Sequence, residues 1–120
     1  MSRESRDVSL RELMEKRGVG ALLLNHPANF AWYTGGADNR VDRGVPAGVA
    51  SVLVTEGSSY IVTDNIEAPR MREELTPSME VVEHPWHEDP APLLRELTGD
   101  ADLGADGPSG RDLSAEIAPQ

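Results

Sequence analysis

An apolar run that passes directly into a polar turn and a short aromatic segment is the feature that most constrains the fold of this chain. The run covers residues 19–24 and ends in Ala-Leu-Leu-Leu, and residues 25–36 then read Asn-His-Pro-Ala-Asn-Phe-Ala-Trp-Tyr-Thr-Gly-Gly. A run this short, bounded by turn signals, suits a strand that is buried on both faces. Pro27 fits the first position of a helix over residues 28–33, and the closing glycine pair fits its end. A buried strand followed by a helix predicts a layered α/β architecture.

The length and charge of the chain exclude several classes of protein. A chain of 120 residues suits one domain with one hydrophobic core, so we predict a single domain over residues 1–120. The formal net charge of -10 repels phosphate backbones and anionic lipid headgroups, which argues against nucleic acid and membrane as partners. The charged start is followed by no apolar signal segment, and no run approaches the roughly 18 apolar residues of a membrane span. The expected location is the cytoplasm.

The acidic excess has two explanations that the sequence leaves open. Acidic residues outnumber basic ones by 21 to 11, and Lys16 is the only lysine. A dense carboxylate surface keeps a protein soluble at high salt, so the excess fits adaptation to a saline environment. Codon bias in a GC-rich genome combined with an ordinary acidic surface is the favoured explanation. Unfolding measured across a salt series separates the two, because a halophilic chain loses structure at low ionic strength.

Hydrophobic periodicity predicts the other elements. Leu10, Leu13 and Met14 recur at helical spacing, which predicts a helix over residues 5–17 that ends at Gly18. The patterns that follow predict four more strands and two more helices. In chain order these are an antiparallel hairpin of residues 49–55 and 59–63, a helix over 66–75, a strand over 79–83, a helix over 90–97 and a short edge strand over 102–105. The helix over 66–75 is expected to carry Ile66, Met71 and Leu75 on its apolar side and to have Asp64 or Asn65 as its cap.

This order predicts an α/β domain in which a mixed sheet carries helices on its faces. The polar residues 37–48 predict a loop or a lip around a cleft, since they combine charges with glycine and proline. Near the end of the chain, Leu113 and Ile117 are the two residues that can anchor a last helical turn. Trp32 and Tyr33 on the short helix are expected to fill the core.

Residues 10–104 resemble the N-terminal domain of the creatinase/prolidase family, which includes the Xaa-Pro peptidases. The resemblance is carried by the ordered combination of the 21–36 segment, the hairpin Val-Leu-Val-Thr and Tyr-Ile-Val-Thr at residues 52–55 and 60–63, and the following Asp-Asn-Ile-Glu-Ala-Pro-Arg at residues 64–70. It implies a sheet with a ribonuclease-H-like arrangement. No single motif here is as specific as a metal signature.

The resemblance also implies a role beside a catalytic domain. In complete members a larger C-terminal domain of the M24 metallopeptidase type hydrolyses bonds preceding proline, or creatine in one branch, with two divalent metal ions held by two aspartates, a histidine and two glutamates. That ligand series has no counterpart in this chain, so no catalytic or metal residue is carried over. By resemblance the chain is the non-catalytic domain of a metal-dependent hydrolase, expected to use manganese. It would cap the catalytic domain, support a homodimer and narrow substrate access.

Arg40 and Arg43 lie in the predicted loop and are the substrate-proximal candidates. In the creatinase branch an aromatic residue and an arginine from the corresponding loop contact the substrate carboxylate, and here the aromatic has no clear equivalent. A guanidinium binds a carboxylate through two parallel hydrogen bonds. Alternatively both arginines pair with Asp38 and Asp42 on the loop surface, where such pairs contribute about 0–1 kcal/mol each.

The segment His-Pro-Trp-His-Glu-Asp at residues 84–89 gathers two imidazoles and two carboxylates. Proline between the histidines prevents the helical spacing of a zincin, and no third ligand is fixed nearby, so metal binding is the weaker interpretation. We instead expect Trp86 and His87 to form an interface with a neighbouring surface, such as the absent catalytic domain. Residues 104–110 are glycine-rich but lack the lysine and hydroxyl of a phosphate-binding loop.

A second function from another class is a stand-alone interaction module. Such a module would bind a protein through the face formed by Trp86 and the 37–48 loop, without any catalytic domain. The coding sequence beyond Gln120 distinguishes the two functions. The sequence does not identify the substrate of a parent enzyme.

Overall fold

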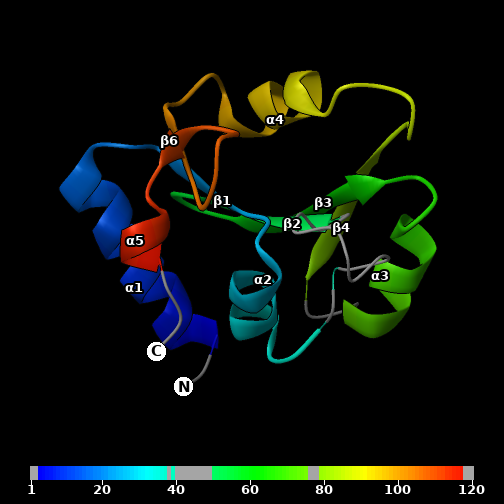
Figure 1. Cartoon of the computed structure of the whole chain (residues 1–120), viewed down its shortest axis with the longest axis horizontal. Helices are drawn as coiled ribbons and strands as arrows, with labels where there is room; N and C mark the ends of the chain where they lie inside the picture. Colours follow the sequence, from blue (N-terminus) through cyan, green and yellow to red (C-terminus); the bar gives the residue numbers. More distant parts are fainter. Residues whose placement is uncertain (1–2, 38, 40–49, 76–78, 118–120) are drawn as a thin grey trace.

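The computed structural model describes residues 3–37, 39, 50–75 and 79–117, and these residues form six strands and five helices (Figure 1). The strands are β1 (Ala21–Leu24), β2 (Ala50–Thr55), β3 (Ser59–Asp64), β4 (Glu80–His84), β5 (Leu103–Ala105) and β6 (Arg111–Asp112). The helices are α1 (Arg3–Arg17), α2 (Pro27–Thr34), α3 (Ala68–Leu75), α4 (Ala91–Thr98) and α5 (Ser114–Ile117). None of these helices is long and apolar enough to cross a membrane.

The strands form one mixed sheet in the order β4-β3-β2-β1-β5-β6. Strand β2 runs antiparallel to both of its neighbours, β1 and β3, whereas the pairs β3–β4, β1–β5 and β5–β6 are parallel. The predicted hairpin is therefore confirmed, and its turn closes through a hydrogen bond of 2.8 Å from the Thr55 N–H to the Ser58 carbonyl. Because only β2 is reversed, the carboxyl ends of the other strands share one edge of the sheet.

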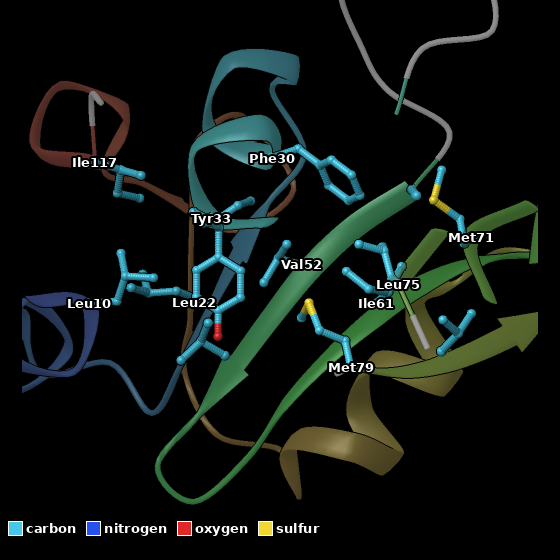
Figure 2. Packing of buried hydrophobic residues seen from close by; sticks show 14 of the residues in the cluster. Leu10, Leu22, Phe30, Tyr33, Val52, Ile61, Met71, Leu75, Met79 and Ile117 are labelled. Atoms are coloured by element: carbon cyan, nitrogen blue, oxygen red, sulfur yellow. The ribbon is translucent and has the colours of Figure 1, made fainter. Parts of the chain in front are cut away.

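The two faces of the sheet are covered unequally. Helices α1, α2, α3 and α5 lie on one face, and α4 lies alone on the other (Figure 1). Figure 2 shows the larger core, in which Tyr33 and Phe30 from α2 are fully buried beside strand residues such as Leu22 and Val52. On the other face, the leucines of α4 pack on a smaller cluster and none is fully buried. The α4 face is thus the thinly covered side of the sheet.

Local signals in the sequence account for the elements around β1. All four residues of β1 are buried, which confirms a strand covered on both faces. Gly18 follows α1 with φ +68°, and Gly35 follows α2 with φ +81° and donates its N–H to the Ala31 carbonyl, so both glycines end their helices as predicted. Trp32 is only partly buried, and the Arg6 guanidinium lies 5.9 Å from its ring centre.

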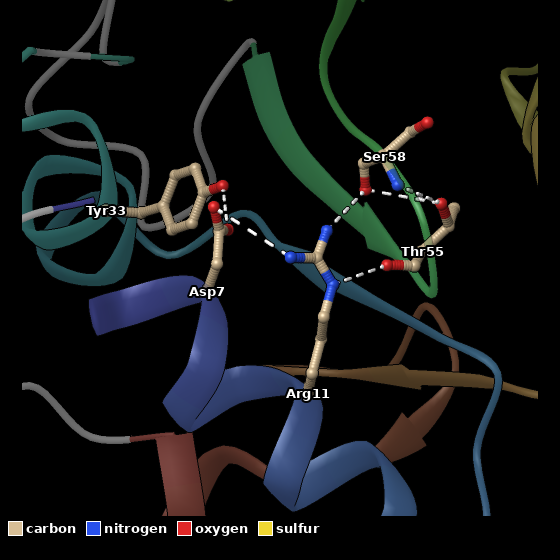
Figure 3. A network of polar contacts seen from close by, with 5 residues as sticks. All are labelled: Asp7, Arg11, Tyr33, Thr55 and Ser58. Atoms are coloured by element: carbon tan, nitrogen blue, oxygen red, sulfur yellow. Dashed lines mark hydrogen bonds and ion pairs between the residues drawn. The ribbon is translucent and has the colours of Figure 1, made fainter. Parts of the chain in front are cut away.

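A polar network ties α1 to the rest of this face (Figure 3). The Tyr33 hydroxyl donates a hydrogen bond to Asp7. Arg11, one turn after Asp7, donates from Nε to the Thr55 carbonyl at 3.1 Å and from Nη2 to the Ser58 carbonyl at 3.3 Å. The network therefore connects α1 both to α2 and to the β2–β3 turn.

The structure corrects three predictions. The strand predicted over 102–105 is β5, and it is not an edge strand, because the chain turns back after it and β6 pairs with its outer side. The helix predicted over 66–75 begins only at Ala68, since Asp64 Oδ1 accepts the N–H groups of Ile66 and Glu67 in a preceding turn. Ile66 therefore lies outside the apolar side of α3 and is 64% exposed. Asp64 therefore caps the turn before α3 and not the first turn of α3 itself.

Candidate functional site

The carboxyl ends of β1 and β5 are joined by one carboxylate. Asp106 directly follows β5 and accepts hydrogen bonds from the Asn25 N–H at 2.9 Å, the His26 N–H at 2.8 Å and the Asn29 side-chain amide at 3.0 Å. His26 in turn caps α2, since its Nδ1 accepts the Ala28 N–H. Asp106 thereby fixes the turn that leads from β1 into α2.

Asn39 is a fully buried polar residue at the same end of β1. Its side-chain amide donates hydrogen bonds of 2.8 Å to the Asn25 carbonyl and to the Ala50 carbonyl. Asn25 also donates from Nδ2 to Ser51 Oγ at 2.9 Å. Asn39 and Ala50 are the described residues on either side of residues 40–49. The hydrogen bond between them therefore holds the two flanks of that segment together. The Asn39 side-chain oxygen is buried and has no hydrogen-bond partner within the described residues.

A cleft of about 420 Å³ opens beside Asn25, on the face of the sheet that carries α4. Apolar side chains from β1, β3 and α4 and polar side chains from the ends of the strands line it. The lining residues are Leu23, Asn25, Ser51, Val62, Asp64, His84, Asp89, Pro90, Ala91, Leu94 and Ser109. Because ligands of open α/β sheets bind at the carboxyl ends of the strands, this cleft is the candidate binding site of the domain.

The polar groups of the cleft are hydrogen-bond acceptors for the most part. Asp64 and Asp89 each use Oδ1 to accept backbone N–H groups, Asp89 from Ala91 at 2.9 Å. The His84 Nδ1 lies 2.9 Å from the Pro85 carbonyl, and since a carbonyl only accepts, a hydrogen bond between them requires the tautomer in which Nδ1 carries the proton. Its Nε2 is then an acceptor in the neutral ring. None of the described lining residues is a lysine or an arginine.

Trp86 presents an exposed ring from a fixed backbone at this end of the sheet. Its N–H donates to Asn65 Oδ1 at 2.7 Å, and the Asn65 N–H donates to the His84 carbonyl at 2.9 Å. The indole is 63% exposed, and the His87 ring meets it edge-on at 5.5 Å between centres. The indole is therefore accessible to solvent, and the interface at Trp86 and His87 stays a prediction.

The site predicted from the sequence overlaps this region only in part. Arg40 and Arg43 fall outside the described residues, so their placement stays a prediction. Trp86 and His87 lie together on the β4–α4 connection. The sequence did not predict Asn39 and Asp106 as site residues, although each comes after the end of a helix or strand. An isolated polar residue in a loop carries no local signal of burial.

The described residues do not fit a two-metal centre. No group of three or more metal-ligating side chains is brought together in residues 3–37, 39, 50–75 and 79–117. The carboxylates at the cleft accept backbone N–H groups as caps. Within the described part of the chain they do not converge with a pair of histidines on one position where a metal ion could bind. The arrangement can position a loop and accept a ligand, and it offers no set of ligands for metal-assisted hydrolysis.

A family model of the creatinase/prolidase N-terminal domain matches residues 6–109. A comparison with curated protein sequences finds no match. The match to the family model covers every described element except the strand and the helix after Gly110.

Solved structures share the fold. An Xaa-Pro dipeptidase from Bacillus anthracis aligns with a TM-score of 0.64 at 14% identity over 87% of this chain, and a prolidase from Pyrococcus horikoshii OT3 with 0.64 at 18% over 94%. This chain spans only 27% and 29% of those two proteins. The N-terminal domain of an Xaa-Pro dipeptidase from Lactobacillus brevis aligns with a TM-score of 0.63 at 15% identity, and the alignment covers 96% of this chain and 90% of that domain.

Proposed function

Since this chain belongs to the creatinase/prolidase N-terminal domain family, we propose that it is the non-catalytic N-terminal domain of an M24-type Xaa-Pro peptidase or dipeptidase. Its task in that enzyme is to limit and shape access of substrate to the catalytic domain. The chain itself performs no hydrolysis. The two divalent metal ions, manganese in this proposal, belong to the catalytic domain, because the described residues offer no matching ligand set.

The observation that carries this proposal is the position of Asn39. Its amide joins Asn25 at the end of β1 to Ala50 at the start of β2, so the two described residues that flank residues 40–49 are held together at the carboxyl end of β1. That point borders the cleft at the carboxyl end of the sheet. A buried amide that fixes both ends of a segment lowers the entropy cost of presenting it to a ligand.

Within this segment, Arg40 and Arg43 are proposed to contact the carboxylate of the substrate. A bidentate guanidinium contact would favour short peptides with a free carboxylate over longer ones that lack it at that position. The competing arrangement pairs the two arginines with Asp38 and Asp42, in which case their removal would leave catalysis unchanged.

Trp86 and His87 are proposed to contact the catalytic domain, and the same contact surface supports a homodimer of the complete enzyme. The support is the fixed backbone of Trp86 together with its 63% exposure. Aromatic residues held in place before binding contribute strongly to interfaces, since little side-chain entropy is lost on contact.

The experiment measures kcat/KM for an Xaa-Pro dipeptide in the protein that carries both domains. We expect Arg40→Ala or Arg43→Ala, whichever makes the contact, to lower kcat/KM about tenfold or more, since a lost charge-assisted hydrogen bond is worth about 1.5–3 kcal/mol. Asn39→Ala is expected to lower it as well, by loosening the anchor of the segment. Arg95→Ala on the exposed side of α4 serves as the control. Unchanged values for both loop arginines would remove the substrate contact from the proposal.

A stand-alone interaction module is the second candidate, and the exposure of Ile66 and Trp86 is expected under either candidate. Both side chains are more than 60% exposed, and Asn65 connects their two turns. In that case the chain has no catalytic partner, and Trp86→Ala abolishes binding to a separate protein. The two candidates differ in whether a catalytic domain is encoded with this chain.

A further inference from the structure

We propose that the cleft between the strand ends and α4 binds a small organic cation, namely a primary ammonium or guanidinium group carried on an apolar body. This inference does not rest on the proposed function, because it concerns the described side chains of the cleft alone. It assigns a ligand class to a cleft whose wall includes Asn25 and Ser51, two of the residues that hold the flanks of residues 40–49.

The floor of the cleft fits an apolar body. Leu23, Val62 and Leu94 line it from β1, β3 and α4, and Pro90 and Ala91 extend the apolar surface along the start of α4. The volume of about 420 Å³ falls within the range of roughly 300–1,000 Å³ that is usual for small-ligand sites. Leu23 and Val62 are each only 5% exposed and form the buried floor, whereas the residues of α4 at the wall are not fully buried.

The rim of the cleft fits a cationic group. Asp64 and Asp89 line it from the ends of β3 and of the β4–α4 connection, and Oδ1 of each is held by backbone N–H groups. For neither carboxylate does the structure show a hydrogen bond to Oδ2 from another described residue. His84, whose Nδ1 faces the Pro85 carbonyl, adds a further acceptor at Nε2 in its neutral form.

The charges of the described lining residues indicate the sign of the ligand. None of these residues is a lysine or an arginine, so within the described part of the chain an anionic ligand would meet two carboxylates and no counter-charge. A cation with several N–H donors gains charge-assisted hydrogen bonds from the same groups. The net charge of -10 also draws cations toward the protein.

The test titrates the 120-residue chain with cyclohexylmethylamine at pH 8 and follows backbone amide shifts by NMR. The matched probe is cyclohexylmethanol, which keeps the apolar ring and lacks the charge. We expect the amine to shift amides at the cleft, those of residues 23–25, 62–65, 89, 91, 93 and 94, and to bind at least about tenfold more tightly than the alcohol, because each charge-assisted bond is worth about a factor of ten or more.

Variants of the two aspartates test which carboxylate binds the ammonium group. Asp64→Asn and Asp89→Asn retain an oxygen for the backbone caps, so they separate charge from folding, and each is expected to weaken binding of the amine about tenfold. Asp112→Asn is the control, because Asp112 also caps a backbone N–H, that of Ser114, and lies away from the cleft. The proposal is overturned if amine and alcohol bind alike, if the shifts lie elsewhere, or if Asp112→Asn weakens binding as much as the cleft variants.

Discussion

The carboxylate of Asp106 accepts a hydrogen bond of 2.8 Å from the backbone N–H of His26, although 80 positions separate the two residues in the chain. The same carboxylate holds the N–H of Asn25 and the side chain of Asn29. It therefore closes the β1–α2 turn from the neighbouring strand. This long-range contact keeps the carboxyl end of β1 in the geometry that Asn39 and the cleft depend on.

Replacing Asp106 with alanine is expected to lower the free energy of unfolding by about 2–4 kcal/mol, since three donors lose a charged acceptor and a partly buried donor left unmet costs about 1–3 kcal/mol. Chemical denaturation measures the change. Asp106→Asn keeps one side-chain oxygen, so its free energy of unfolding should fall between those of the parent and Asp106→Ala. The exposed Asp102→Ala provides the control and is expected to stay within about 0.5 kcal/mol of the parent. An Asp106→Ala variant as stable as that control would show that the carboxylate does not hold the turn.

Gly104 in β5 is predicted to tolerate no side chain. An added Cβ would lie 2.8 Å from Leu22 Cδ2 and 2.9 Å from Leu113 Cδ1, both of which are packed in the core. Gly104→Ala should therefore destabilise the protein by about 1–3 kcal/mol through overpacking. At Gly107 an added Cβ meets no atom within 4 Å, so Gly107→Ala is the matched control and should be close to neutral. Thermal unfolding compares the two, and equal melting temperatures would contradict the packing at β5.

The hydrogen bond from Tyr33 to Asp7 is expected to couple α2 to α1 (Figure 3). Tyr33→Phe removes the hydroxyl and keeps the buried ring, so the expected loss is about 1–2 kcal/mol of unfolding free energy. A double-mutant cycle with Asp7→Asn should return a coupling of about 1 kcal/mol. Additive losses in the cycle would mean that the two side chains act independently.

Asp112 gives a pH dependence with a defined sign. Hydrogen bonds from the side chain and the backbone N–H of Ser114 lower the pKa of this carboxyl below the usual value for aspartate. Because the folded-state pKa is the lower one, the contribution to stability is present above the unfolded-state pKa and is lost as the pH falls through the folded-state pKa. The effect therefore belongs to the region below about pH 4.

An NMR titration of the Asp112 carboxyl carbon tests this prediction. Ser114→Ala removes the hydroxyl donor and should raise the Asp112 pKa toward the usual value, while the backbone bond of 2.9 Å from the Ser114 N–H keeps part of the shift. An unchanged titration in that variant would assign the shift to another cause.

Elements with strong local signals could be predicted from the sequence. The buried run of β1, the proline at the start of α2 and the glycines after α1 and α2 are local features, and each is confirmed. The β2–β3 hairpin is confirmed for the same reason, since its turn residues stand between two short β-rich runs. Such features depend on neighbours within a few positions.

The rest depends on contacts between distant parts of the chain. Strand β6 has only two residues, both exposed, and so short a segment has no hydrophobic pattern that predicts a strand. The prediction that β5 lies at the edge of the sheet was therefore wrong. The burial of Asn39 and the three contacts of Asp106 likewise arise only when the ends of β1 and β5 meet. The cleft is assembled from six separate stretches of the chain, which is why the sequence predicted a loop and not the side chains that line the cleft.

The central claim is that this chain is the non-catalytic domain of a two-metal peptidase, and the coding sequence after the codon for Gln120 tests it most directly. The account predicts that the reading frame continues into a second domain that carries the series Asp, Asp, His, Glu, Glu. A stop codon at that position would contradict the claim and leave an α/β module whose function is to bind another protein.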